Sequence, residues 1–214
     1  MGGRVTITGG DARHLARSLR ARAGEDIEVI DPAGRLLTVR LESVTTDMVE
    51  GVVVAERPHQ PEPKARITIA IANLPAPALE LVLSRCTEAG AYAFHVFQAE
   101  RSVARGAKLE RWATICREAS MLAGRLRIPE VDALESLDAV LKASDHAVML
   151  VRDASQSLAR LTLPSHLTLL VGPEGGWSDR ELAAVAERAG LGPRNLRADT
   201  AALVGLSIAL AMRE

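Results

Sequence analysis

The sequence predicts an α/β protein in which a small β-rich domain precedes a larger domain built on a mostly parallel sheet. Two observations predict this division. The first is residues 57–64, where three prolines in six residues can continue neither a helix nor a central strand. The second is the order of elements after this linker, because short apolar runs alternate with helical patterns, as in a parallel sheet covered by helices. We therefore expect domains at residues 1–64 and 65–214.

The first domain is predicted mainly from strand-forming runs. These runs occupy residues 27–31, 36–44 and 48–55. Asp31-Pro32-Ala33-Gly34 is a turn signal between the first two of them. A short helix is expected before the strands, beginning at Asp11 with Leu15 and Leu19 on one face.

The second domain is predicted to alternate strands and helices. Strand-like apolar runs occupy residues 67–72, 92–97, 146–151 and 167–171. The spacing of apolar residues predicts helices over residues 79–86, 109–119 and 134–141. Gly90 is placed to end the first of these helices. Residues 178–181, Ser-Asp-Arg-Glu, form a capping box, so a helix should begin there and end at Gly190.

The last segment, residues 200–212, is apolar on nearly all sides. A helix of that kind has to be buried over most of its surface. A position inside the core or an interface with a second copy of the chain would each bury it, and the sequence leaves both open.

Two glycine-rich turns, one on either side of the capping-box helix, are the strongest functional signal. Residues 169–178 are Leu-Leu-Val-Gly-Pro-Glu-Gly-Gly-Trp-Ser, and residues 191–197 are Leu-Gly-Pro-Arg-Asn-Leu-Arg. Both follow or contain short apolar runs, so they should lie at strand ends, where open α/β sheets bind ligands. Glycine lets the backbone approach a flat ligand closely. Together the turns predict a small-molecule cleft.

Other nucleotide-binding and hydrolytic motifs are missing from the sequence. A dinucleotide-binding fingerprint would place GxGxxG after the first strand of the second domain, but that strand leads into residues 73–77, Asn-Leu-Pro-Ala-Pro. Neither a phosphate-binding Gly-Lys-Ser/Thr nor a Gly-x-Ser-x-Gly elbow occurs. The cleft is therefore expected to belong to a different α/β topology.

Composition excludes further classes. Five aromatic residues in 214 are too few for a broad base-stacking platform. The sequence has neither an apolar run of signal-peptide length at its start nor about eighteen consecutive apolar residues anywhere, so we expect a cytoplasmic protein without a membrane span. Cys86 and Cys116 are isolated and are predicted to be small core residues of a reduced protein. The five histidines show no metal-ligand spacing, and no metal is expected.

Basic residues are unevenly distributed, although the net charge is only −1. Arginine and lysine outnumber acidic residues between residues 101 and 127. A second basic cluster, in the first predicted helix, comprises Arg13, Arg17, Arg20 and Arg22. A basic face on a nearly neutral protein suits a structured RNA that is held through its phosphates. The alternative for either cluster alone is a solvated helix face.

The two turns and several shorter motifs resemble one family of enzymes. Residues 172–178, Gly-Pro-Glu-Gly-Gly-Trp-Ser, followed by residues 191–201, are similar to the bacterial 16S ribosomal RNA (uracil-N3) methyltransferases of the SPOUT superfamily. The resemblance extends to residues 99–103, to Lys108 with Arg111-Trp112, and to parts of residues 118–129. It covers essentially the whole chain.

The resemblance implies S-adenosyl-L-methionine as cofactor and 16S rRNA, or the assembled small ribosomal subunit, as substrate. It implies a homodimer in which each site lies near the subunit boundary. It also implies that residues 1–64 form a PUA-like, RNA-binding β-barrel and that residues 65–214 form a SPOUT methyltransferase domain with a C-terminal trefoil knot. Nothing in composition or periodicity suggests a knot.

The cofactor site implied by the resemblance consists of the two turns. Backbone groups around Gly172, Leu191 and Leu196 are expected to contact adenine and ribose, with Leu191, Leu196 and Ala201 as apolar walls. The full set of expected cofactor-binding residues is Leu170, Val171, Gly172, Glu174, Gly175, Gly176, Leu191, Gly192, Leu196, Arg197 and Ala201. RNA contacts are expected from Arg13, Arg17, Arg101, Arg125 and Arg127.

Methylation of uracil N3 requires removal of the N3 proton, or stabilisation of the resulting anion, while the methyl donor is aligned for in-line attack. A carboxylate can accept the proton, and an arginine can stabilise negative charge on O2 or O4. Asp199 and Arg197, beside the second turn, are the candidate catalytic residues. Asp199 also fits as the N-cap of the last helix, and this alternative stays open.

The chain departs from the family pattern in places. Met121-Leu122 occupy positions where the family usually has Glu-Gln, Ala198-Asp199 replace the usual Thr-Glu, and a lysine expected near residues 74–77 is missing. Cofactor binding should survive because it depends on backbone groups, whereas target and rate are more sensitive. Two other functions stay open: a SPOUT methyltransferase acting on a ribose 2′-hydroxyl or another uridine, and a non-catalytic RNA-binding or assembly protein.

Overall fold

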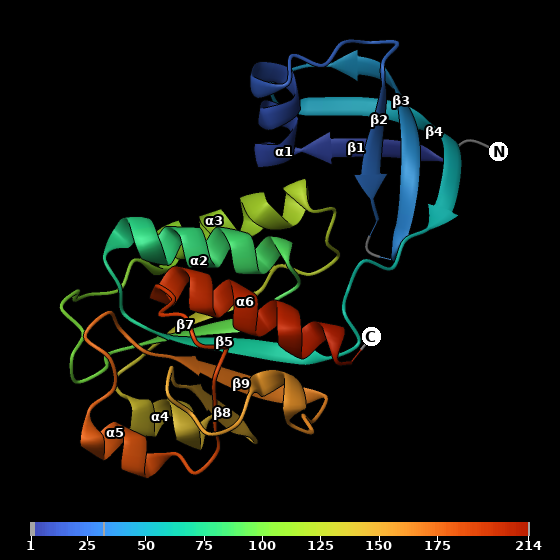
Figure 1. The fold of residues 1–214 in the computed structure, drawn as a ribbon. Coiled ribbons are helices and arrows are strands. Elements are labelled where there is room, and N and C mark those ends of the chain that lie inside the picture. Colours follow the sequence, from blue (N-terminus) through green and yellow to red (C-terminus); the bar gives the residue numbers. More distant parts are fainter. Residues whose placement is uncertain (1–2, 32, 214) are drawn as a thin grey trace. The chain divides into compact units, whose positions relative to one another are not determined.

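The structure is a computed structural model that describes residues 3–31 and 33–213. The chain divides into two compact units after Pro61, inside the proline-rich linker (Figure 1). Each unit has a sheet and a hydrophobic core of its own.

The first unit is an antiparallel sheet with a short helical segment. Its elements are β1 (Arg4–Thr8), α1 (Gly9–Arg13), the π-helix η1 (His14–Ser18), β2 (Asp26–Ile30), β3 (Arg35–Val44) and β4 (Met48–Pro58). The strand order is β1-β4-β3-β2. The β-rich domain and three of its strands were predicted; β1 was not. The 31–34 turn is closed by a hydrogen bond from Gly34 N to Asp31 O, while Pro32 lies outside the described residues.

The predicted first helix differs from the observed one in its start and its face. It begins at Gly9 rather than Asp11 and continues as the π-helix. Ala12 is its fully buried residue, and it packs against Leu37, Val39, Leu41 and Val49 of the sheet. Leu19 lies beyond the helical segment and is 62% exposed, so it does not share the buried face with Leu15.

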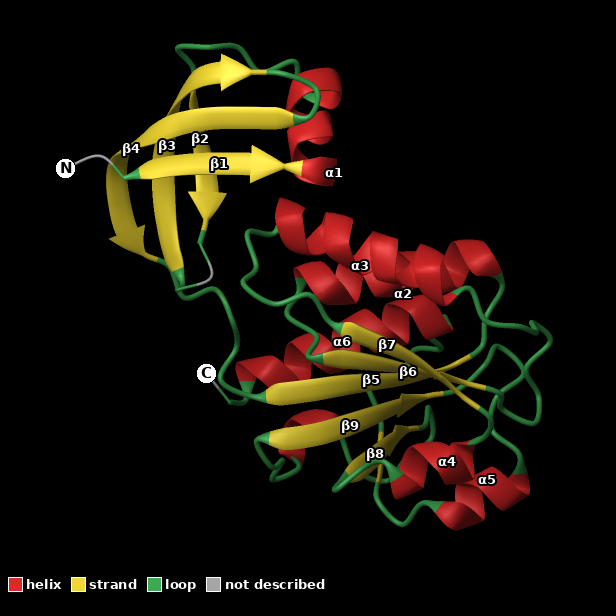
Figure 2. Cartoon of the chain, turned by 180° about the vertical axis from the view of Figure 1, so that it is seen from behind, coloured by secondary structure: helices red, strands yellow, loops and turns green. Residues whose placement is uncertain are grey.

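The second unit is a six-stranded parallel sheet with helices on both faces (Figure 2). Its elements are β5 (Arg66–Ala72), α2 (Ala76–Glu88), β6 (Ala93–Phe97), α3 (Leu109–Leu122), β7 (Glu130–Leu134), α4 (Leu137–Lys142), β8 (Ala147–Leu150), the 3-10 helix η2 (Leu158–Arg160), β9 (His166–Val171), α5 (Asp179–Ala184), β10 (Arg188–Ala189) and α6 (Ala198–Ala211). The strand order is β10-β8-β9-β5-β6-β7, and every pairing is parallel. The predicted covered parallel sheet is confirmed.

Alternate residues of the central strand β5 face the two helical layers, as the period of two along a strand requires. Ile67, Ile69 and Ile71 join the core under α2, α3 and α6. Ala70 and Ala72 join the core under α4 and α5. Both faces are therefore apolar, which explains why this strand is a nearly continuous apolar run in the sequence.

Two features of the second unit, strand β7 and the end of helix α5, differ from what the sequence predicted. β7 was not anticipated, because Glu130–Leu134 alternates with acidic residues and pairs as an edge strand with β6. The capping-box helix ends at Ala184 rather than Gly190, since Val185 is extended and the chain re-enters the sheet as β10, beside β8. The capping box itself is present, formed by Ser178 and Glu181.

Helix α6 occupies an internal position, one of the two alternatives that the sequence left open. Its buried residues are Ala198, Ala202, Gly205, Leu206, Ala209 and Leu210. Gly205 permits the close approach of the helix to the sheet, because a Cβ there would lie 2.8 Å from Leu150 Cδ1. Leu203, Val204 and Ile208 of the same helix remain half-buried.

Arg125, expected to contact RNA, is instead a buried structural residue. Its side chain is 3% exposed and forms an ion pair of 2.6 Å with Glu62. Its Nη1 donates to the carbonyls of Thr87 and Ala91, and the other oxygen of Glu62 accepts from the amides of residues 126 and 127. With its donors satisfied inside the fold, this guanidinium is not available to a phosphate, and the expectation of an RNA contact there is corrected.

The Glu62–Arg125 pair predicts a pH-dependent contribution to stability. Burial raises the pKa of Glu62, but the hydrogen bond and charge of Arg125, together with two backbone amides, hold this pKa below its usual value. A lowered folded-state pKa gives stability that is complete above the unfolded value of about 4.3 and is lost as pH falls through the folded value. Glu62→Gln should therefore lower the free energy of unfolding by about 3 kcal/mol at pH 7, and by less in acid.

Chemical denaturation of wild type and variant at pH 7 and at pH 3, well below the unfolded-state pKa, measures this difference. The control is Glu80→Gln, which breaks the exposed Glu80–Arg111 pair and should cost less than about 1 kcal/mol. Equal losses in the two variants would contradict a special role for the buried pair.

Candidate active site

A cavity of about 580 Å³ lies at the carboxyl edge of the parallel sheet, where β8, β9 and β10 end. Its volume is in the range of small-molecule and cofactor sites. Its lining residues are Leu150, Val151, Arg152, Asp153, Val171, Gly172, Pro173, Glu174, Gly175, Gly176, Trp177, Leu182, Leu191, Gly192, Arg194, Asn195, Leu196, Arg197, Ala198 and Ala201. The two glycine-rich turns thus face one common space, as the sequence predicted.

The structure brings the expected cofactor residues together around this cavity, with one exception. Leu170 is fully buried, packs in the core under α4 and α5 and does not line the cavity. The apolar wall is formed by Leu191, Leu196 and Ala201, together with Val171 from the end of β9.

Trp177, which sequence reasoning left without a role at the site, fixes the first turn. Its indole stacks on Phe97 with ring centroids 6.2 Å apart, and its Nε1 donates to the carbonyl of Leu150 at 3.0 Å. A Cβ on Gly172 would lie 2.9 Å from the indole ring, so only glycine fits there without movement. The side chain thereby connects the ends of β6, β8 and β9.

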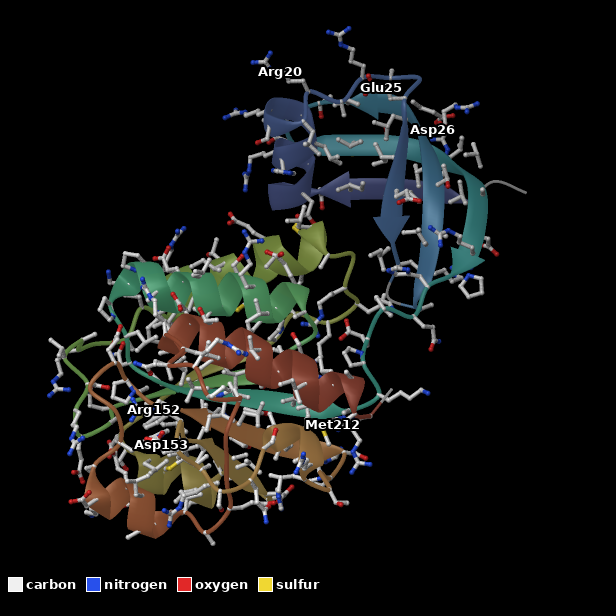
Figure 3. All side chains as sticks on the ribbon, in the orientation of Figure 1. Arg20, Glu25, Asp26, Arg152, Asp153 and Met212 are labelled. Carbon is white, nitrogen blue, oxygen red and sulfur yellow. The ribbon has the colours of Figure 1, made fainter. Side chains whose placement is uncertain are left out.

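A third turn, directly after β8, also lines the cavity and was missed. It contributes Val151, Arg152 and Asp153. Arg152 and Asp153 are exposed and paired at 2.6 Å, and the hydrogen bond with Arg152 lowers the pKa of Asp153 (Figure 3). The available signal was the predicted strand 146–151, because its carboxyl end must lie at the same edge as that of its parallel neighbours.

The candidate catalytic residues are neighbours but differ in environment. Arg197 lines the cavity, and its side chain is 76% exposed. Asp199 is 11% exposed, does not line the cavity, and has its Oδ2 3.5 Å from Arg197 Nη2. The N-cap alternative for Asp199 was wrong: α6 begins at Ala198 with Arg197 at the N-cap, and Asp199 Oδ1 accepts from the amide of Thr200 in the first turn.

The other arginines that were expected to contact RNA lie in different surroundings. Arg101 follows β6, and its Nη1 donates to the carbonyl of Gly175 in the cofactor turn at 3.3 Å. Arg127 is half-buried over the ring of Tyr92, 3.8 Å from the centroid. Arg13 and Arg17 are exposed on the helical segment of the first unit.

In the part of the chain that the structure describes, the cysteines lie in the core and the histidines belong to no metal-binding cluster. Cys86 and Cys116 are buried and unpaired, as predicted, and burial raises the pKa of Cys86 to about 12. Among the residues that the structure describes, no cluster of histidine, cysteine and acidic side chains could hold a metal ion. None of the helices in this part of the chain has the length and apolar character required to cross a membrane.

The fold and the cavity define the class of protein: a small antiparallel β unit joined to a parallel α/β unit that binds a small molecule at the carboxyl edge of its sheet. Comparison with known proteins identifies the family. Residues 60–210 match the family described as RNA methyltransferase domain, and residues 7–54 match the family described as RNA methyltransferase PUA domain. The chain belongs to this RNA methyltransferase family.

Relatives with curated names agree over nearly the whole chain. The chain is 30% identical to Ribosomal RNA small subunit methyltransferase E of Bacillus subtilis, over 94% of this chain and 88% of the relative. It is 33% identical to the protein of the same name from Mycobacterium tuberculosis, over 95% and 85%. A Ribosomal RNA small subunit methyltransferase E from Neisseria gonorrhoeae, solved bound to S-adenosyl methionine, has 27% identity and a TM-score of 0.87, with 99% of this chain and 92% of that chain covered.

Gly172→Ala should weaken ligand binding in the cavity, because the added methyl group displaces the indole of Trp177 and with it the first turn. We expect the dissociation constant for S-adenosyl-L-methionine to rise about 5- to 150-fold, since side-chain overlap in a packed site costs about 1–3 kcal/mol. Isothermal titration calorimetry measures it.

Gly190→Ala is the matched control. Its Cβ would have ordinary contacts, at 3.5 Å or more, and Gly190 does not line the cavity. Equal loss of affinity in both variants would contradict the proposed role of the Gly172–Trp177 contact.

Proposed function

We propose that this protein methylates N3 of a specific uridine in the 16S rRNA of the small ribosomal subunit, with S-adenosyl-L-methionine as methyl donor. The observation that supports this function most directly is that both glycine-rich turns line one common cavity. A protein solved with this cofactor matches the chain over 99% of its length.

The cavity residues fit the cofactor chemically. Leu191, Leu196 and Ala201 offer apolar contact to adenine, and the glycine-rich turns expose backbone donors and acceptors for its edges. Arg152 and Asp153 place opposite charges at the mouth, which suits the carboxylate and ammonium of an amino acid. When bound, the cofactor supplies an electrophilic methyl group on a sulfonium.

Arg197 and Asp199 are proposed to act on the uracil. Arg197 is exposed at the cavity, so it can reach O2 or O4 and stabilise the negative charge that remains when N3 loses its proton. Asp199 lies 3.5 Å from that guanidinium and is the carboxylate proposed to accept the N3 proton. Asp199 does not line the cavity itself, so contact with the uracil requires a movement of the exposed Arg197 side chain beside it.

The exposed arginines are proposed to hold the RNA through its phosphates. Arg101 borders the cofactor turn, whereas Arg13 and Arg17 belong to the first unit, proposed to be the RNA-binding domain. Arg127 is proposed as a further contact. The trefoil knot that the resemblance implied belongs to the same proposal, and so do the two domains, at residues 1–64 and 65–214, that the proline-rich linker predicted.

Methyl transfer from labelled cofactor to small ribosomal subunits and to naked 16S rRNA tests the function, with the labelled nucleoside identified by mass spectrometry. We expect label in 3-methyluridine. Label in a 2′-O-methylated or other nucleoside would show a different target, and Met121 and Leu122, which depart from the family pattern, would be the first residues to test. Cofactor binding without transfer to either substrate would overturn the catalytic proposal in favour of a non-catalytic RNA-binding protein.

Asp199→Asn should lower kcat about a hundredfold, because the amide cannot accept the N3 proton, and should leave the cofactor dissociation constant within about threefold of wild type. Single-turnover methyl transfer gives the rate. Asp132→Asn, the same change at a carboxylate of β7 that is 63% exposed and does not line the cavity, is the control and should retain most of the rate. A near-normal rate for Asp199→Asn would show that this carboxylate does not accept the N3 proton.

A homodimer is proposed because Leu203, Val204 and Ile208 of α6 remain half-buried in a single copy of the chain. Light scattering should give twice the mass of 22.8 kDa for the wild-type protein. Val204→Asp should shift the mass toward the single-chain value, because an unpaired charge is costly to bury at an interface. A wild-type protein that stays at the single-chain mass at working concentrations would overturn the dimer.

A further inference from the structure

The buried carboxylate of Glu181 joins two segments that lie far apart in the sequence. Its side chain belongs to α5, and the residue is only 3% exposed. Oε2 accepts from the amide of Ser178, at the end of the first glycine-rich turn, at 2.9 Å. Oε1 accepts from the amide of Glu100, in the loop after β6, at 3.0 Å.

A capping box explains only the first of these hydrogen bonds. A glutamate at the third helical position normally bonds back to the N-cap amide, here that of Ser178. The bond to Glu100 is additional and spans 81 residues of sequence. Because an unpaired buried carboxylate is costly, both oxygens need their donors, and the two segments are held in fixed register.

Arg101 follows Glu100 directly and lies against the cofactor turn. Its Nη1 donates to the carbonyl of Gly175, and a Cβ on Gly175 would lie 3.3 Å from the Cβ of Arg101. The position of this exposed arginine is therefore set by the neighbouring amide that Glu181 holds. The carboxylate of Glu181 thus contacts the turn of residues 172–178 at Ser178, and Arg101 contacts the same turn at Gly175; we call the link from Ser178 through Glu181 to Glu100 the Glu181 tie.

We propose that Glu181 is a positioning residue that fixes the loop containing Glu100 and Arg101 to the cofactor turn, residues 172–178. The guanidinium of Arg101 then contacts the RNA at a fixed position relative to the methyl donor. This inference rests on the proposed function. The guanidinium of Arg101 provides the contact with the RNA, and Glu181 acts through it from inside the fold.

Glu181→Gln separates the two hydrogen bonds. The glutamine amide has one acceptor oxygen and an NH2 group that cannot accept from an amide. The bond to Ser178 is the local one, three residues away, so the oxygen is expected to keep it and to leave the amide of Glu100 without its acceptor. The helix should then remain capped while the loop is released.

We expect Glu181→Gln to lower kcat/KM for the RNA substrate about tenfold, since the lost hydrogen bond is charge-assisted and such bonds are stronger than neutral ones. The cofactor dissociation constant should change less than threefold. In an Arg101→Ala background, Glu181→Gln should cause almost no further loss, because residues that act through one contact are not additive. The proposal would be overturned if the loss of kcat/KM in the double variant equalled the product of the two single-variant losses. A tenfold weaker cofactor affinity in Glu181→Gln would also overturn it.

Arg180→Ala is the matched control. Arg180 bridges the same two segments from outside, pairing with Glu100 at 3.1 Å and Asp138 at 2.7 Å, but its side chain is 70% exposed. Exposed pairs contribute little, so this variant should keep kcat/KM within about twofold of wild type. A loss as large as that of Glu181→Gln would show that any link between α5 and the loop suffices, and would overturn the specific role of Glu181.

Amide hydrogen exchange tests the tie without any activity. The Glu100 amide should be protected in the wild-type protein and should exchange at least tenfold faster in Glu181→Gln, with the Ser178 amide little changed. Unchanged protection of Glu100 would overturn the inference. If the tie is confirmed but the wild-type protein transfers no methyl group, the proposed function fails while the structural coupling stands.

Discussion

The carboxyl edge of the parallel sheet depends on the indole of Trp177. It stacks on Phe97 at the end of β6, donates a hydrogen bond to Leu150 at the end of β8 and packs on Gly172 just after β9. One rigid side chain therefore sets the spacing of three strand ends. A buried indole needs a partner for its N–H, and here a strand-terminal carbonyl is that partner, so the ring has one orientation. The position of the first glycine-rich turn is fixed by these contacts of Trp177.

The cavity follows from that constraint. With the first turn held by Trp177, the chain enters α5, returns to the sheet as β10 beside β8, and forms the second turn opposite the first. The first turn is also held at Ser178 by the buried carboxylate of Glu181, and it accepts a hydrogen bond from Arg101 at Gly175. A site that depends on backbone positions needs such support, because a flat ligand is bound well only by edges that are already in place.

Much of this arrangement is predictable from sequence because it depends on local patterns. Apolar runs, the capping box at Ser178 and the glycine spacing predicted the parallel sheet and the common cavity. Contacts between distant segments were not predictable. The same arginine-rich stretch contains exposed Arg101 and buried Arg125, and only the tertiary contacts of Arg125 with Glu62 and with two backbone carbonyls distinguish them. Strand β10 was missed for a related reason, since two residues form a strand only where β8 offers an edge.

Titration of the protein with S-adenosyl-L-methionine, followed by the indole N–H resonances of its two tryptophans, tests the central claim most directly. Trp177 lines the cavity, whereas Trp112 is buried in the core that contains α2 and α3 and does not line it. We predict a saturable shift of the Trp177 resonance and an almost unchanged Trp112 resonance. Cofactor binding that leaves Trp177 unmoved, or that shifts Trp112 instead, would contradict the assignment of the cofactor site.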